Sequence, residues 1–153
     1  LRNMIYWKDV PYGNGGSVVA IARDKSGKEV ARHRIETAGK AVALRIEAET
    51  PTDWKADGMD LQYINVTVID KKGRPVWDYN EPLTLQMEGA ARLVALDNGD
   101  HYTDELFHGI TSKRMYQGRM QIILRSDQEA GNVTVKISSA GLKGTLRLKT
   151  IKE

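Results

Sequence analysis

The run of eight residues from Tyr63 to Asp70 constrains the fold of this chain more than any other stretch. Branched aliphatic residues alternate there with polar ones: Ile64, Val66 and Val68 are separated by Asn65 and Thr67. A period of two is typical of a β-strand that buries one face. The following Lys71-Lys72-Gly73-Arg74-Pro75 predicts a turn, because glycine accepts positive φ and proline cannot continue a ladder.

The same alternation recurs along the rest of the chain, which predicts an all-β fold. It is found over residues 83–87, 120–125, 133–138 and 145–149, and glycine-containing turns separate the last two. Strands with such spacing are typical of an antiparallel sandwich. Over three turns, no segment keeps the period of 3.6 that a helix requires.

The first third of the chain predicts four further strands, at residues 4–7, 17–23, 29–37 and 42–49. An immunoglobulin-type sandwich needs about seven strands to cover both inner faces. We therefore expect residues 1–49 to be an incomplete sandwich. Trp7 and Tyr12 are expected to cover its core.

Composition excludes several classes of protein. The 153 residues contain no cysteine, so disulfides and thiolate metal sites are impossible. No apolar run approaches the roughly 20 residues of a membrane helix, and we expect no membrane partner. The net charge of +3 comes from basic residues scattered among acids, whereas a nucleic-acid binder concentrates them on one face. The chain begins at Leu1 and shows no signal segment, which suggests a fragment of a longer protein.

Several separated blocks resemble one enzyme family in the same order. They are Trp7-Lys8-Asp9-Val10-Pro11-Tyr12, Ala56-Asp57-Gly58, the spaced set Asp70, Gly73, Pro75 and Val76, Asp97-Asn98-Gly99-Asp100, and Lys113-Arg114-Met115-Tyr116-Gln117-Gly118. Together they resemble the C-terminal immunoglobulin-like region of bacterial, Bacteroides-type β-galactosidases of glycoside hydrolase family 2. The catalytic barrel of those enzymes is not part of this chain.

The resemblance implies two domains. Residues 1–49 would be the last strands of a preceding, truncated β-sandwich, and residues 50–153 a complete immunoglobulin-like one. The polar Thr50-Pro51-Thr52-Asp53 break marks the boundary. Trp54, just past it, is expected to lie between the two domains.

The resemblance also implies a noncatalytic role: bracing the catalytic barrel of a glycosidase or mediating its assembly, in the periplasm or outside the cell. Expected partners are the other domains of the parent enzyme, a second copy paired through the exposed strand edge of the truncated unit, and a glycan. A carbohydrate-binding module and a cell-surface adhesion or spacer domain remain alternatives.

Candidate chemistry is sparse, and we expect no catalytic residue, metal or cofactor in this chain. Asn80-Glu81 imitates the acid/base pair of barrel glycosidases, but retaining hydrolysis needs a second carboxylate about 5 Å away in a cleft. His101 and His108 lie among acids in a long predicted loop, residues 101–118, in an order that matches neither an EF-hand loop nor a His-Glu-x-x-His helix. Asp97 and Asp100 are better explained as caps of tight turns around Gly99.

Four aromatic residues are the candidate carbohydrate-binding residues. Trp77 and Tyr79 flank Asp78, and Tyr102 and Tyr116 bracket the long segment. Exposed aromatic rings stack on sugars because they combine apolar area with a polar edge. The alternative is that they pack against the end of the sandwich or a neighbouring domain.

Overall fold

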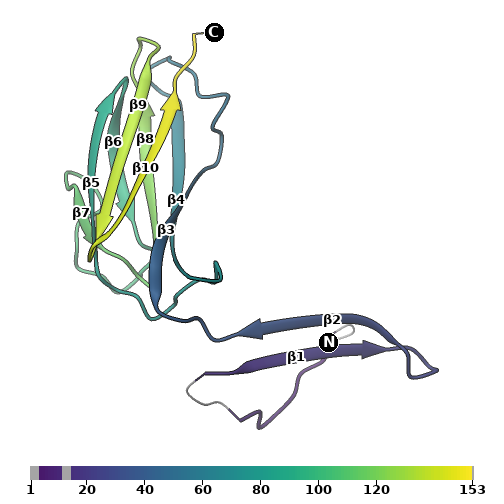
Figure 1. Cartoon of the computed structure of the whole chain (residues 1–153). Helices are drawn as coiled ribbons and strands as arrows, with labels where there is room; N and C mark the ends of the chain where they lie inside the picture. The colour runs from purple at the N-terminus through teal and green to yellow at the C-terminus, as the bar shows by residue number, and fades with distance from the viewer. Residues whose placement is uncertain (1–3, 12–14, 153) are drawn as a thin grey trace. The chain divides into compact units, whose positions relative to one another are not determined.

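The computed structural model describes residues 4–11 and 15–152, and within them the chain is all-β (Figure 1). These residues form ten strands and no helix, so they include no helix that could span a membrane. The chain divides into two compact units, Leu1–Thr37 and Ala38–Glu153.

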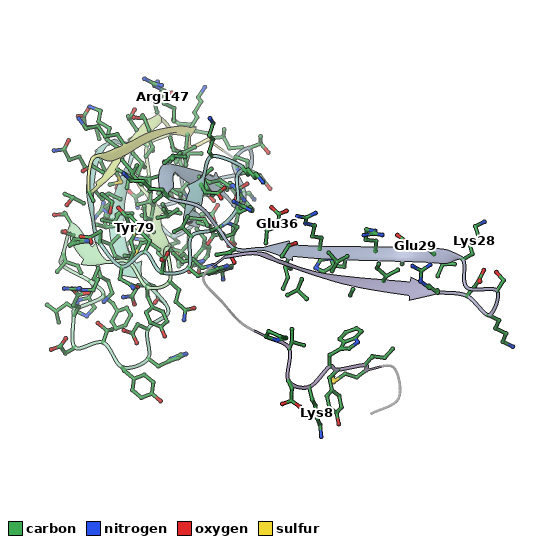
Figure 2. The ribbon with its side chains drawn as sticks, turned by 60° about the horizontal axis from the view of Figure 1, so that its bottom comes forward. Lys8, Lys28, Glu29, Glu36, Tyr79 and Arg147 are labelled. Atoms are coloured by element: carbon green, nitrogen blue, oxygen red, sulfur yellow. The ribbon has the colours of Figure 1, made fainter. Side chains whose placement is uncertain are left out.

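The first unit contains one antiparallel hairpin of β1 (Ser17–Arg23) and β2 (Glu29–Glu36). Its turn at Asp24–Gly27 is capped by Asp24, whose carboxylate accepts hydrogen bonds from the amides of Ser26 and Lys28 at 2.8 and 3.0 Å. Figure 2 shows Lys28 and Glu29 beside this turn and Glu36 at the far end of β2. Four apolar side chains of the hairpin are exposed: Val18, Ile21, Val30 and Ile35.

The strand predicted at residues 4–7 is wrong. These residues are exposed and belong to no strand. A run of apolar residues becomes a strand only when a second strand accepts its backbone hydrogen bonds, and no described strand pairs with it. Tyr12, expected with Trp7 to cover this unit, lies outside the described residues.

The second unit is a sandwich of two four-stranded sheets (Figure 1). One sheet has the order β3-β4-β8-β6, with β3 (Ala41–Ala48), β4 (Leu61–Asp70), β8 (Arg119–Ser126) and β6 (Ala91–Asp97). The other has the order β10-β9-β5-β7, with β10 (Leu142–Lys149), β9 (Asn132–Ser139), β5 (Pro82–Gly89) and β7 (Ser112–Arg114). The chain changes sheet at every step from β4 to β9, which makes the architecture that of an immunoglobulin-like sandwich.

Strand β4 lies at the centre of the first sheet, as its sequence predicts. Ile64, Val66 and Val68 are fully buried in the core, whereas Asn65 and Thr67 lie on the outer face. The inner row of β8, Met120, Ile122 and Leu124, lies beside that of β4 in the same sheet. The inner rows of β5 and β9 fill the opposite side of the core with leucine, valine and isoleucine. The alternation read from the sequence therefore corresponds to two facing apolar layers.

Asp70 ends β4 and organises the predicted turn. Its carboxylate accepts hydrogen bonds from the Arg74 Nε at 2.8 Å and from the backbone amides of Lys72, Arg74 and Gly39 at 2.8 to 2.9 Å. The Arg74 guanidinium, followed by the Gly39 amide, holds the pKa of Asp70 well below its ordinary value. One carboxylate thus fixes both the turn and the first residues of the second unit.

The chain divides between Thr37 and Ala38 rather than between residues 49 and 50, where the sequence predicts the domain boundary. Strand β3 pairs with β4, with Leu44 opposite Val68 and Ile46 opposite Val66. Ile46 also closes the side of the sandwich: a Cβ added to Gly144 of β10 would lie 2.3 Å from its Cδ1. Periodicity indicated this strand correctly but does not specify which strand it pairs with.

Trp54 is a core residue of the sandwich rather than an interdomain contact. Its side chain is 1% exposed and packs with the buried cluster. The indole Nε1 donates a hydrogen bond to the Asp60 carbonyl at 3.1 Å. A large aromatic ring next to a predicted boundary can therefore cap one domain instead of bridging two.

Candidate functional site

The topology gathers the four candidate aromatic residues at one end of the sandwich, which we call the aromatic end: Trp77, Tyr79, Tyr102 and Tyr116. They lie in the β4–β5 connection, the β6–β7 connection and the β7–β8 turn. Thr67 at the end of β4 pairs with Arg119 at the start of β8, and Asp97 at the end of β6 pairs with Gln121. Antiparallel pairing therefore brings these connections together (Figure 1).

Trp77 is half-exposed, and a cation covers one face of its ring. The guanidinium carbon of Arg119 lies 4.3 Å from the ring centroid, which is a favourable cation–π distance. The indole is 48% exposed. Only the uncovered face of the ring and its edge remain available for a sugar or a protein surface.

Tyr79 is committed to the sandwich itself. Its hydroxyl lies 2.8 Å from the Ser139 Oγ and 3.1 Å from the Ser139 carbonyl oxygen, and its ring packs on the core (Figure 2). Packing explains this residue without a ligand, and its role in glycan binding stays a prediction.

Tyr116 begins the tight turn that joins β7 to β8. Its amide and carbonyl bond to the carbonyl and amide of Arg119 at 3.2 and 3.0 Å. The two residues between them, Gln117 and Gly118, have φ of 49° and 67°, as a type I′ hairpin turn requires. Only glycine fits the second position, because a Cβ there would lie 2.2 Å from the Val76 carbonyl oxygen.

Tyr102 projects from the β6–β7 connection with 96% of its surface exposed. The connection is nonetheless ordered by short turns at its start. The Asp97 carboxylate accepts the Gly99 amide at 2.9 Å, and the Asp100 carboxylate accepts the Tyr102 amide at 3.0 Å. This confirms the prediction that these aspartates cap turns around Gly99.

A residue that the sequence did not single out, Lys113, anchors this connection. It is 2% exposed, and its Nζ donates hydrogen bonds to the carbonyls of Glu105 and Leu106 at 3.1 and 3.0 Å. The ammonium also lies 4.1 Å from the centroid of Phe107. Lys113 belongs to the short strand β7, so residues 101–118 are not one continuous loop.

The backbone held by Lys113 leaves apolar side chains facing outward. Leu106 and Phe107 are exposed, as are Tyr102 and Trp77. The sequence does not predict that Lys113 is buried and binds backbone carbonyls. Ser112-Lys113-Arg114 has the composition of an exposed polar segment.

The Asn80-Glu81 pair also lies at the aromatic end, between Tyr79 and β5. Glu81 is exposed, and its carbonyl accepts a hydrogen bond from the Met115 amide at 3.1 Å, so it belongs to a connecting turn. Within residues 4–11 and 15–152, no three His, Asp or Glu side chains are close enough together to hold a metal ion.

Residues 44–146 match the family model described as glycoside hydrolase family 2 C-terminal domain 5. A β-galactosidase of Bacteroides ovatus is 32% identical over 128 residues, which cover 84% of this chain and 15% of that protein. A β-galactosidase of Thermoanaerobacter pseudethanolicus is 30% identical over 132 residues, covering 84% of this chain and 17% of that protein.

Solved structures give the same result. A glycosyl hydrolase family 2 member from Bacteroides cellulosilyticus superimposes with a TM-score of 0.85 at 28% identity, covering 94% of this chain and 18% of that one. The chain thus spans less than a fifth of the length of these relatives. The family model, the relatives and the fold agree, and the chain therefore belongs to the family described as glycoside hydrolase family 2 C-terminal domain 5.

Proposed function

We propose that this chain is a noncatalytic accessory domain of a longer glycoside hydrolase, in which the aromatic end packs against the other domains. Two relatives that match it are named β-galactosidases and a third, of Formosa agariphila, is named a β-glucuronidase. We propose β-galactosides as the substrates of the longer enzyme, because both β-galactosidases match over 84% of this chain. Its catalytic barrel would contribute the two carboxylates that hydrolysis needs.

The observation that carries this proposal is the exposed apolar surface on an anchored backbone. Tyr102 and Leu106 face outward from a connection that Lys113 holds in place, and Phe107 is partly exposed beside them. Exposed apolar patches of this kind mark interaction surfaces, and an anchored backbone loses little conformational entropy on docking. The core beneath is filled by the inner rows of both sheets, which supports a bracing role.

Two experiments test the proposal. The 153-residue chain alone is expected not to hydrolyse a chromogenic β-galactoside; turnover would refute it. In the longer enzyme, replacing Tyr102 and Leu106 by serine is expected to lower the melting temperature. The same double variant of the isolated chain should melt almost as the wild type does, because these side chains are already exposed there. An unchanged melting temperature of the longer enzyme would contradict docking at this surface.

A second candidate function is carbohydrate binding at the same end, favoured by the exposure of Trp77 and Tyr102. Trp77→Ala should then abolish binding of galactosides measured by calorimetry, whereas Tyr79→Phe should preserve it because the Tyr79 hydroxyl contacts Ser139. Absence of binding at millimolar ligand would remove this candidate. An adhesion or spacer role stays a prediction from the fold class.

We also propose that the hairpin of the first unit associates with another strand. A two-stranded sheet is at best marginally stable alone, and both of its strands present unpaired edges. The isolated chain is expected to dimerise weakly at high concentration, and Val18→Lys with Ile35→Lys to reduce that dimerisation. Sedimentation as a monomer at all concentrations would contradict it.

We propose a periplasmic or extracellular location for the longer enzyme, which cell fractionation tests.

A further inference from the structure

The outer face of the β10-β9-β5-β7 sheet is strongly basic. Side chains that point away from the core form cross-strand rows, which we call the basic face: Thr84, Ser138 and Lys143; Gln86, Lys136 and Thr145; Glu88, Thr134 and Arg147; Asn132 and Lys149. Across β10, β9 and β5 this face holds four cations and one carboxylate, so basic residues that are scattered among acids in the sequence gather on one side of the sheet. Its excess of positive charge is therefore as large as the net charge of +3 of the whole chain.

Most of this charge has no partner within the described residues. The single carboxylate, Glu88, lies 3.3 Å from the Lys136 Nζ in a solvent-exposed pair. Lys143, Arg147 and Lys149 make no ion pair with a described residue, and Arg147 projects from the sandwich in Figure 2. An exposed cluster of like charges attracts polyanions over a distance of about a Debye length.

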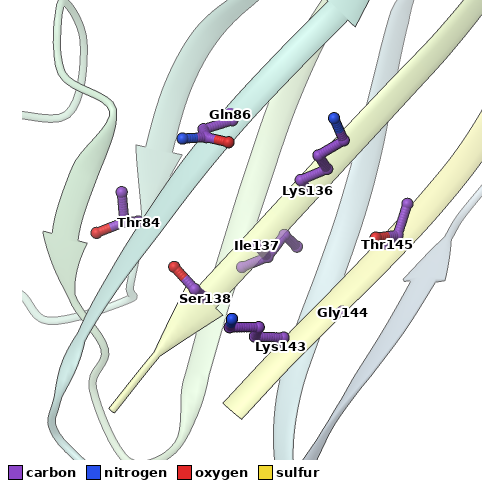
Figure 3. Close-up of a pocket in the computed structure, with 8 residues that line it drawn as sticks. All are labelled: Thr84, Gln86, Lys136, Ile137, Ser138, Lys143, Gly144 and Thr145. Carbon is purple, nitrogen blue, oxygen red and sulfur yellow. The ribbon is translucent and has the colours of Figure 1, made fainter. Parts of the chain in front are cut away.

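A hollow of about 340 Å³ lies on the same face. Figure 3 shows its polar lining: Thr84, Gln86, Lys136, Ser138, Lys143 and Thr145. Three hydroxyls and one amide therefore accompany two ammonium groups. Hydroxyl and amide groups can both donate and accept hydrogen bonds, which suits the hydroxyls of a sugar ring.

Protection of an edge strand explains only part of this pattern. Lysines on an edge prevent unwanted strand pairing, and Lys143, Arg147 and Lys149 lie on β10, an edge of its sheet. Lys136 lies on the interior strand β9, and the hydroxyl and amide groups of β5 lie further inside. The combined rows therefore point to a ligand.

The residue types favour an acidic glycan over other polyanions. The basic face contains no aromatic residue on which a nucleobase could stack. Its outward rows also contain no large apolar residue that could enter a lipid surface. A sulfated glycan carries sulfates in place of some ring hydroxyls, whereas a uronate keeps its ring hydroxyls and adds one carboxylate. The uronate therefore suits a hollow lined by hydroxyl and amide groups better.

We propose that the basic face binds a polysaccharide that contains uronate residues. Lys143, Arg147 and Lys149 face the carboxylates, and the hollow between β5 and β10 receives the sugar hydroxyls. Outward residues along β10 are spaced by about 7 Å, which suits a linear ligand with recurring charges. This inference does not depend on the aromatic end or on the accessory role proposed above.

The test is affinity electrophoresis of the 153-residue chain in gels that contain polygalacturonate or neutral galactan. We expect retardation by polygalacturonate only, weakening as salt is added. Lys143→Glu with Arg147→Glu should weaken binding about tenfold or more, since two attractive contacts become repulsive. The matched control, Lys40→Glu with Lys71→Glu, makes the same charge change beside the opposite sheet and should reduce binding much less.

A second pair of variants tests the hydroxyl contacts without changing charge. Thr84→Val with Ser138→Ala should weaken binding of polygalacturonate and leave binding of dextran sulfate unchanged. Absence of retardation by polygalacturonate at low salt would overturn the proposal. So would equal affinity for duplex DNA, dextran sulfate or anionic phosphatidylglycerol vesicles, because charge alone would then explain the interaction. Circular dichroism would establish that each variant is folded.

Discussion

The hairpin β1–β2 and the pair β3–β4 are two antiparallel pairs with similar sequence patterns and opposite surroundings. In the hairpin, Val18 and Ile35 lie opposite each other and are 51% and 59% exposed. In β4, Ile64 and Val66 are fully buried beneath the second sheet. Alternation thus predicts that a strand forms. Whether its apolar face is buried depends on a second sheet, which the sequence of the strand itself does not specify.

Removal of a buried side chain should have the largest effect on stability and should distinguish the two pairs most clearly. Ile64→Ala should destabilise the sandwich by about 2–5 kcal/mol, because it removes apolar contacts and leaves a cavity. Ile35→Ala in the hairpin should change the free energy of unfolding of the sandwich by no more than about 0.5 kcal/mol. Urea unfolding followed by tryptophan fluorescence measures both, and equal effects would mean that the hairpin is also packed in solution.

A smaller difference between the two regions should be seen in how the stability of the sandwich depends on pH. The lowered pKa of Asp70 means that its stabilising contacts are present in full above the ordinary carboxyl pKa of 3.8 and are lost as the pH falls below it. Asp70→Asn should therefore be less stable than the wild type at neutral pH, and the difference should shrink in acid.

Asp24→Asn is the control for this pH dependence. The pKa of Asp24 is also lowered, chiefly by the hydrogen bond from the Ser26 hydroxyl, but its turn belongs to the hairpin. Unfolding of the sandwich should have the same pH dependence in this variant as in the wild type. A constant difference between wild type and Asp70→Asn from neutral to acid pH would contradict the assignment.

The smallest expected effect concerns the turns of the two regions. In the β1–β2 turn, the residue with positive φ is a glycine, Gly27. In the β7–β8 turn, the first of the two residues with positive φ is Gln117. Gln117→Gly should stabilise the sandwich by about 1 kcal/mol, because glycine adopts this conformation without a Cβ clash. Lys25→Gly should give no such gain, and its thermal melting provides the comparison. A loss of stability in Gln117→Gly would show that the glutamine side chain matters more than its backbone.

Local chemistry predicted the local features of this fold. Alternation located β4, and the residue types of Asp70-Lys71-Lys72-Gly73 and Asp97-Asn98-Gly99 predicted their turns, because an aspartate captures amides that are close in sequence. The gathering of Trp77, Tyr79, Tyr102 and Tyr116 at one end depends on strand pairing, which no local signal supplies.

The wrong predictions share the same physical cause. Residues distant in sequence determine which strand β3 pairs with. They also determine that Trp54 is buried and that the Lys113 side chain points inward. The apolar residues 4–7 carried a local strand signal and found no described partner. Periodicity describes one strand at a time, whereas these positions depend on which strands meet.

The hydrogen bond between Asp70 and the Gly39 amide also has a mechanical consequence. It fixes the point where the chain enters the sandwich, at the start of β3, while β10 ends at the opposite end (Figure 1). Tension applied through these two points acts along the strand axes. The β3–β4 hydrogen bonds would then be loaded in shear and would have to break together, a geometry that resists forced extension better than unzipping one bond at a time.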